Sequence, residues 1–209
     1  MEQQENNNEI KHSPIIENAE LLHTTPYVNL KKIDGFYFAE RKGVDSVAFV
    51  LFATNTNDEK RIGLIDEFKI PVNKSLVTAF GGSIDDEKYH NDLRTLVQEE
   101  VLEESGFTVK LEDIDYYGKM YVSTQMNQFC HLFGVTVDKN LQGLRTTTNP
   151  RELESVVTWI TVPEVLQLED WKALTIVTKR MASRKITLNI RPINNQSPTT
   201  AEQENGTGQ

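Results

Sequence analysis

Three carboxylates fall within a single turn of a segment that the sequence predicts to be helical. Glu100, Glu103 and Glu104 would project from one side of a helix, because residues three and four apart share a face. Gly106 follows at the position where helices commonly end in a left-handed residue. Crowded carboxylates repel one another unless a cation lies among them, and dense oxygen sites are what Mg²⁺ and Mn²⁺ prefer. The spacing therefore indicates a divalent metal site.

The alternative for this segment is an acidic helix face that is simply solvated, and composition alone favours neither. Two features favour the metal site. Leu93, Leu96 and Val97 precede the glutamates on nearly the same face, so the carboxylates continue a stripe that we expect to be buried. Upstream, Gly81 and Gly82 predict a turn that brings bare backbone to the same place, where a carbonyl could complete the coordination of a metal.

The segment 100–107, with the sequence Glu-Val-Leu-Glu-Glu-Ser-Gly-Phe, resembles the second half of the Nudix box and matches it without a gap. The first half of the box fits less well, because the stretch between Gly82 and Glu100 is a few residues longer than the family pattern. Glu99 stands where the family has an arginine that orients a glutamate. The first glutamate of the box then has three candidates in this chain, namely Asp85, Asp86 and Glu87.

The resemblance implies a metal-dependent hydrolase that cleaves a pyrophosphate bond, with Mg²⁺ or Mn²⁺ as cofactor. By correspondence with the family, Glu100 and Glu104 are the principal metal ligands, and Glu103 is a further ligand or orients water. The backbone carbonyl of Gly81 completes the coordination shell. In this chemistry the metal makes hydroxide available near neutral pH and neutralises charge on the phosphates.

Many family members carry one more glutamate, a base or an added ligand, in the loop before a late strand. Glu152 and Glu154 stand in that loop, and on an extended chain they would point the same way. We favour Glu154 as the catalytic base and count Glu152 and Gly82 among the substrate-binding residues. Phe68 and Lys69 match a substrate-contacting segment of one branch of the family. Lys69 is a candidate phosphate contact, whereas Phe68 fits a core position better than a base-stacking one.

The layout of the chain is similar to that of the ADP-ribose and nucleoside-diphosphate-sugar pyrophosphatases, in which an N-terminal sheet precedes the core and often takes part in dimer formation. The favoured substrate is therefore ADP-ribose or a sugar nucleotide, and a homodimer through the N-terminal sheet is expected. Thr124 and Gln125 replace the Pro-Gly pair of that branch. NADH, a dinucleoside polyphosphate and a capped RNA end are alternative substrates. A regulator that binds nucleotides without turnover is the alternative from another class.

Composition narrows the class of protein. The chain has 209 residues, of which 38% are hydrophobic, so one domain with a proper core is expected. A net charge of −9 disfavours extended nucleic-acid binding, which usually needs a basic surface. The single cysteine, Cys130, excludes an intramolecular disulfide, and neither a signal peptide nor an apolar run of roughly 20 residues is apparent. We expect a cytoplasmic protein that does not enter membranes.

The order of the predicted elements gives an α/β fold. It is a Nudix-type α/β/α sandwich with a mixed sheet, preceded by an N-terminal β-hairpin or small antiparallel sheet. Residues 1–15 and 194–209 are polar and predict a disordered arm and tail. Between them, 16–193 form a single domain, with N-terminal strands in 16–42 and the core in 43–193. The predicted strands cover 28–33, 36–39, 45–54, 76–80, 109–114, 116–122, 129–135 and 156–160, and the last helix covers 171–181. His131 lies inside a strand pattern, where a core histidine is expected.

Overall fold

The computed structural model describes residues 16–42, 44–54, 61–85, 89 and 92–183. The predicted disordered segments, 1–15 and 194–209, lie outside the described residues. The helices are α1 (Leu93–Ser105), α2 (Pro150–Leu153), α3 (Val162–Val165) and α4 (Trp171–Ala182). The strands are β1 (Glu20–Thr24), β2 (Asn29–Ile33), β3 (Phe36–Glu40), β4 (Ser46–Thr54), β5 (Ile62–Lys69), β6 (Lys74–Thr78), β7 (Phe80–Ser83), β8 (Ile114–Ser123), β9 (Met126–Asp138) and β10 (Val156–Ile160).

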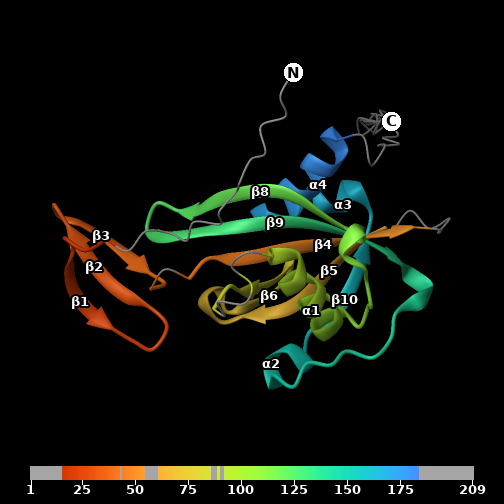
Figure 1. The fold of residues 1–209 in the computed structure, drawn as a ribbon, viewed down its shortest axis with the longest axis horizontal. Coiled ribbons are helices and arrows are strands. Elements are labelled where there is room, and N and C mark those ends of the chain that lie inside the picture. The colour runs from red at the N-terminus through yellow and green to blue at the C-terminus, as the bar shows by residue number, and fades with distance from the viewer. Residues whose placement is uncertain (1–15, 43, 55–60, 86–88, 90–91, 184–209) are drawn as a thin grey trace, which may run out of the picture.

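Strand β4 lies at the centre of a mixed sheet (Figure 1). It pairs in parallel with β9 along its whole length, from Ser46 opposite Cys130 to Thr54 opposite Asp138. On its other edge it pairs antiparallel with β7 and then with β5, and β5 continues the sheet to β6 and β10. The uninterrupted apolar run of β4 predicted a strand buried on both faces, and the structure confirms it.

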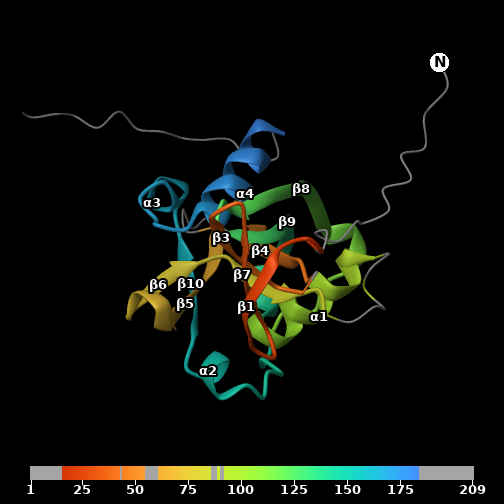
Figure 2. The same cartoon turned by 90° about the vertical axis from the view of Figure 1, so that its left-hand side faces the viewer.

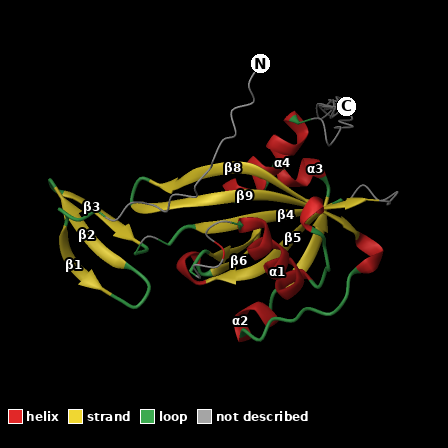
Figure 3. Ribbon diagram, in the orientation of Figure 1, coloured by secondary structure: helices red, strands yellow, loops and turns green. Residues whose placement is uncertain are grey.

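Helices cover both faces of this sheet (Figure 3). Alternate residues of β4 separate into two cores, because successive side chains of a strand point to opposite faces. Val47, Phe49 and Leu51 pack in the core beneath α1. Ala48, Val50 and Phe52 pack in the core beneath α3 and α4. The predicted α/β/α sandwich is therefore the observed fold.

The N-terminal strands form a small antiparallel sheet of their own, set to one side of the sandwich in Figure 1 and facing the viewer in Figure 2. Strands β2 and β3 make the predicted hairpin, whose turn residues Asp34 and Gly35 both have positive φ, of 49° and 82°. Two-residue hairpin loops favour this conformation. A short parallel pairing, Ala39 with Met126 and Glu40 with Asn127, joins the small sheet to β9.

Two local expectations were wrong. Gly81 and Gly82 do not form a turn but lie within β7, paired with Ala48 and Val47 of β4. Most of the predicted strand 109–114 is instead a connection with a short 3-10 helix, Leu111–Asp113, and β8 begins only at Ile114. Within the described residues, no helix is long and apolar enough to cross a membrane.

Candidate functional site

Helix α1 positions the candidate carboxylates. Its N-terminus is capped by Asp92, whose carboxylate accepts a hydrogen bond of 3.1 Å from the Arg94 backbone N–H. Gly106 ends it in the left-handed conformation, with φ of 79° and a 3.1 Å hydrogen bond from its N–H to the Leu102 carbonyl. Val97 and Val101 are fully buried in the core shared with β4 and β7. The face that carries them continues into Glu104, which is therefore held at the sheet.

Two of the three predicted carboxylates lie against the glycine strand β7. Glu104 is only 8% exposed, and its carboxylate accepts a 3.3 Å hydrogen bond from the Gly81 N–H. A Cβ added to Gly82 would stand 2.6 Å from Cδ of Glu100, so the absence of a side chain at Gly82 leaves the space that the Glu100 carboxyl group occupies. Glu103, the third carboxylate, is exposed. The glycines thus act through close approach inside a strand, and the contact observed at Gly81 is made by its N–H.

Burial and mutual repulsion disfavour the charged forms of both carboxylates. Burial raises the pKa of Glu104 to about 8, and repulsion from Glu100 and Glu152 adds to it. Burial likewise raises the pKa of Glu100 to about 7, with further repulsion from Glu103, Glu152 and Asp85. In the described part of the chain, no lysine, arginine or histidine forms an ion pair with either group. The site therefore has an excess of negative charge that a cation would relieve.

The donor set fits a hard divalent cation. Among the described residues, no three acidic, histidine or cysteine side chains stand close enough to enclose a metal by themselves. Glu100 and Glu104 nevertheless offer two neighbouring carboxylates, and Mg²⁺ in proteins is often held by one or two carboxylates while keeping several water ligands. The arrangement can hold such an ion on Glu100 and Glu104.

The first half of the motif is only partly described. Asp86 and Glu87, two of the candidates for the first glutamate, lie outside the described residues. Asp85, the third, is exposed and close enough to raise the pKa of Glu100. Glu99, which replaces the family's arginine, accepts a hydrogen bond from the Tyr89 hydroxyl. An acid–tyrosine contact therefore stands at the position that holds an arginine in the Nudix box pattern.

The loop that carries Glu152 and Glu154 is not extended as predicted. Pro150 begins the one-turn helix α2, a position that proline favours, and the Asn149 side-chain amide donates a 2.6 Å hydrogen bond to Glu152. The Thr147 hydroxyl donates a second one to Glu152. Glu152 lines the same cavity as Glu104, whereas Glu154 lines a different one. The two glutamates therefore do not point the same way, and Glu152 is the one that faces the Glu100–Glu104 pair.

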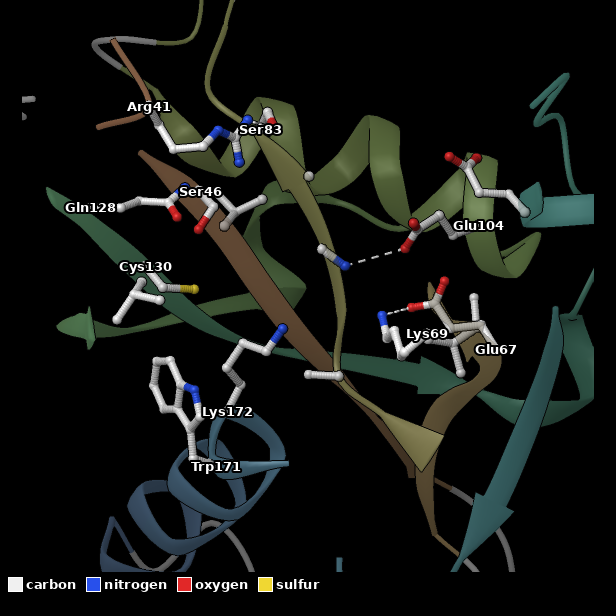
Figure 4. A pocket seen from close by; sticks show the side chains of 17 residues that line it. Arg41, Ser46, Glu67, Lys69, Ser83, Glu104, Gln128, Cys130, Trp171 and Lys172 are labelled. Atoms are coloured by element: carbon white, nitrogen blue, oxygen red, sulfur yellow. Dashed lines mark hydrogen bonds and ion pairs between the residues drawn. The ribbon is translucent and has the colours of Figure 1, made fainter. Parts of the chain in front are cut away.

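The cavity beside β7 has a volume of about 420 Å³ and is shown in Figure 4. Lys69, a predicted phosphate contact, lines it but is ion-paired with the neighbouring Glu67. Phe68 is not a core residue. It is 56% exposed and lines the second cavity, of about 710 Å³, together with Glu154. The prediction failed because this end of β5 extends past the cores that the helices cover.

Several residues that line the cavity come from parts of the chain that carry no recognisable motif. Arg41 follows β3, and Trp171 and Lys172 begin α4. Cys130 also lines the cavity, but burial raises the pKa of its thiol, which disfavours the reactive thiolate. His131 is buried in β9 as expected, with its Nδ1 3.1 Å from the Tyr116 hydroxyl.

Comparisons with known proteins agree with this architecture. No family model matches the chain, and no curated protein matches its sequence. Among solved structures, the crystal structure of an ADP compounds hydrolase matches with a TM-score of 0.61 and 13% identity, over 84% of this chain and 96% of that one. At this identity the likeness extends to the fold alone, which is an α/β fold of the Nudix type with an N-terminal strand region.

Proposed function

We propose that this protein hydrolyses the pyrophosphate bond of a nucleoside diphosphate linked to another group, in a reaction that depends on Mg²⁺ or Mn²⁺. One observation carries the proposal. Glu100 and Glu104 lie together against the glycine strand, Glu104 buried and Glu100 partly buried, with no cationic partner among the described residues. Burying two carboxylates in this way is costly unless a cation accompanies them, and a metal–diphosphate complex supplies one.

Each residue of the site has a distinct task in this proposal. A bound divalent ion would lower the pKa of a water molecule and balance charge on the diphosphate. Glu100 and Glu104 hold that ion, the Gly81 N–H orients the Glu104 carboxylate, and Glu103 orients outer water. Glu152 accepts the proton of the attacking water, because it is the loop carboxylate that faces the cavity with Glu104.

The favoured substrate contains ADP. The structural neighbour is called an ADP compounds hydrolase, and the N-terminal sheet matches the layout of ADP-ribose and sugar-nucleotide pyrophosphatases. Phe68 is a candidate contact for a ring of the substrate, since it is exposed in the second cavity. NADH, dinucleoside polyphosphates and a capped RNA end are alternative substrates of the same chemistry. A cytoplasmic location and a homodimer through β1–β3 complete the proposal.

A nucleotide-binding regulator without turnover is the second candidate. Two features favour the regulator. Glu99 stands in the place of an arginine, and Glu103 is exposed, so the set of charged residues differs from the Nudix box pattern. The buried Glu100–Glu104 pair favours the enzyme, since binding a nucleotide alone does not call for clustered carboxylates.

The test is hydrolysis of a panel of ADP-ribose, sugar nucleotides, NADH, diadenosine tetraphosphate and nucleoside triphosphates, with Mg²⁺ or Mn²⁺. The wild type is compared with Glu104→Gln and with Glu112→Gln, a matched control at an exposed glutamate paired with Lys110. We expect metal-dependent cleavage of one substrate class, lost in Glu104→Gln and kept in Glu112→Gln. If the folded wild type cleaves no member of the panel, the enzyme proposal is rejected in favour of a nucleotide-binding regulator.

A further inference from the structure

The cavity beside β7 is charged asymmetrically. Glu104 and Glu67 lie along one side of it, whereas Arg41 and Lys172 reach it from the top and the bottom of the view in Figure 4. In Figure 4 the ammonium end of Lys172 points from α4 into the cavity, and Arg41 lies near Ser83 at its rim. Acidic and basic groups therefore share one cavity, and among the described residues neither Arg41 nor Lys172 is ion-paired with a carboxylate that lines it.

The two cations have little compensation within the described residues. Arg41 donates a 3.1 Å hydrogen bond to the Ser83 hydroxyl, a neutral group. No carboxylate of the described chain forms an ion pair with Arg41 or with Lys172. Both residues are partly buried, so each loses hydration without gaining an ionic partner. An anion in the cavity would offset that loss.

Lys69 differs from these two residues. It lines the same cavity, but its ammonium is already paired with Glu67. Its positive charge is therefore largely balanced within the protein, and the uncompensated charge lies at Arg41 and Lys172.

Both cations are anchored near β7, the strand that also holds the carboxylates. The Ser83 partner of Arg41 is the last residue of that strand. The backbone of Lys172 is held by Asp170, a buried residue whose carboxylate accepts hydrogen bonds of 2.7 Å from the Ala79 N–H and 3.4 Å from the Lys172 backbone N–H. Ala79 immediately precedes β7. The basic and the acidic residues of the cavity are thus both attached to β7 or to the residue that precedes it.

We propose that Arg41 and Lys172 form a phosphate subsite, which binds the phosphoryl group of the substrate that lies farther from Glu100 and Glu104. This inference rests on the proposed function. It assigns the two linked phosphoryl groups of the substrate to different parts of the cavity, one to the carboxylates and one to the cations. Trp171 lines the cavity beside Lys172, and such an apolar wall strengthens the attraction between the cations and a phosphate by limiting solvent.

The test measures binding without turnover. In a Glu104→Gln background, ADP and inorganic pyrophosphate are titrated calorimetrically into the full chain with chelator present. Adding Arg41→Gln or Lys172→Gln is expected to weaken both ligands by roughly 10- to 100-fold, since each removes a charge-assisted hydrogen bond. Lys110→Gln, at an exposed lysine on the connection after α1, is the matched control and should leave affinity unchanged. Lys172→Arg keeps the charge and should retain most of the binding.

The outcomes separate this inference from the proposed function. Equal affinities in the parent, Arg41→Gln and Lys172→Gln proteins would overturn the subsite, even if the wild type hydrolyses a nucleotide. A folded parent that binds neither pyrophosphate nor ADP would overturn it as well. Loss of binding in both variants, together with a wild type that cleaves nothing, would uphold the subsite and reject the enzyme.

Discussion

A methyl group added at Gly82 should disable the site while leaving the fold intact. The added Cβ would stand 2.6 Å from Cδ of Glu100, whereas carbon atoms in contact are normally about 3.5 to 4.0 Å apart. The carboxyl end of Glu100 must therefore move by about 1 Å. It can do so because it is the free end of a flexible side chain. A displacement of about 1 Å at a catalytic group can cost on the order of 100-fold in rate.

Gly81→Ala is the matched comparison for this prediction. Its Cβ would also meet an atom at 2.6 Å, but that atom is the backbone carbonyl oxygen of Val47 in β4. The clash cannot be relieved by a side-chain rotation, so we expect a loss of about 1–3 kcal/mol in the free energy of unfolding. Gly82→Ala, which has no positive φ to strain, should change that free energy by less than about 1 kcal/mol.

The assay combines urea unfolding with Mn²⁺ binding and hydrolysis for the two variants. We expect Gly82→Ala to unfold like the wild type while losing metal affinity and about 100-fold in kcat/KM. A Gly82→Ala protein with unchanged metal affinity and activity would refute the placement of Glu100 against β7.

Three further predictions concern protonation, the base and assembly. In the metal-free protein, the pKa values of Glu104 and Glu100 rise from 4.5 to about 8 and about 7, so the folded state binds more protons than the unfolded state and stability should fall as pH rises from 4.5 through 8. At about 1.4 kcal/mol per pKa unit, the free energy of unfolding measured with urea should fall by several kcal/mol over this pH range. Either Mg²⁺ or the Glu104→Gln substitution should make the fall smaller. An equal fall in Glu104→Gln would contradict the assignment of this pH dependence to the Glu104 carboxyl group. Glu152→Gln should lower kcat by about 100-fold or more, and Glu154→Gln should lower it by far less. If steady-state kinetics show the larger loss in Glu154→Gln, then Glu154 and not Glu152 is the catalytic base. Phe36 of the N-terminal sheet is 50% exposed, and Phe36→Lys should convert a dimer into a 23.9 kDa monomer by light scattering; a monomeric wild type would reject the dimer.

The elements of the core could be predicted because their signals are local. The apolar run of β4 indicated a strand buried on both faces, and the Asp34–Gly35 pair indicated a hairpin, since each depends only on neighbouring residues. The end of α1 at Gly106 follows from the same kind of local chemistry. The proximity of Glu100 and Glu104 also follows from helix geometry alone.

The parts of the site that could not be predicted depend on tertiary contacts. Paired glycines usually indicate a turn, but Gly81 and Gly82 are needed within a strand because Val47 and Glu100 approach them closely. The sequence predicted an extended loop around Glu152, because the one-turn helix that begins at Pro150 is too short to show the hydrophobic periodicity of a helix. Nothing in the sequence joins residues 41 and 172, which only the packing of α4 and of the segment after β3 around the sheet brings to one cavity.

The most direct test of the central claim is a Mn²⁺ titration followed by electron paramagnetic resonance, on the wild type, Glu104→Gln and the control Glu112→Gln. The buried Glu100–Glu104 pair predicts a binding site in the wild type and in Glu112→Gln that is lost or strongly weakened in Glu104→Gln. Identical Mn²⁺ binding by all three proteins, or no binding by any of them, would contradict a metal-dependent function at this site.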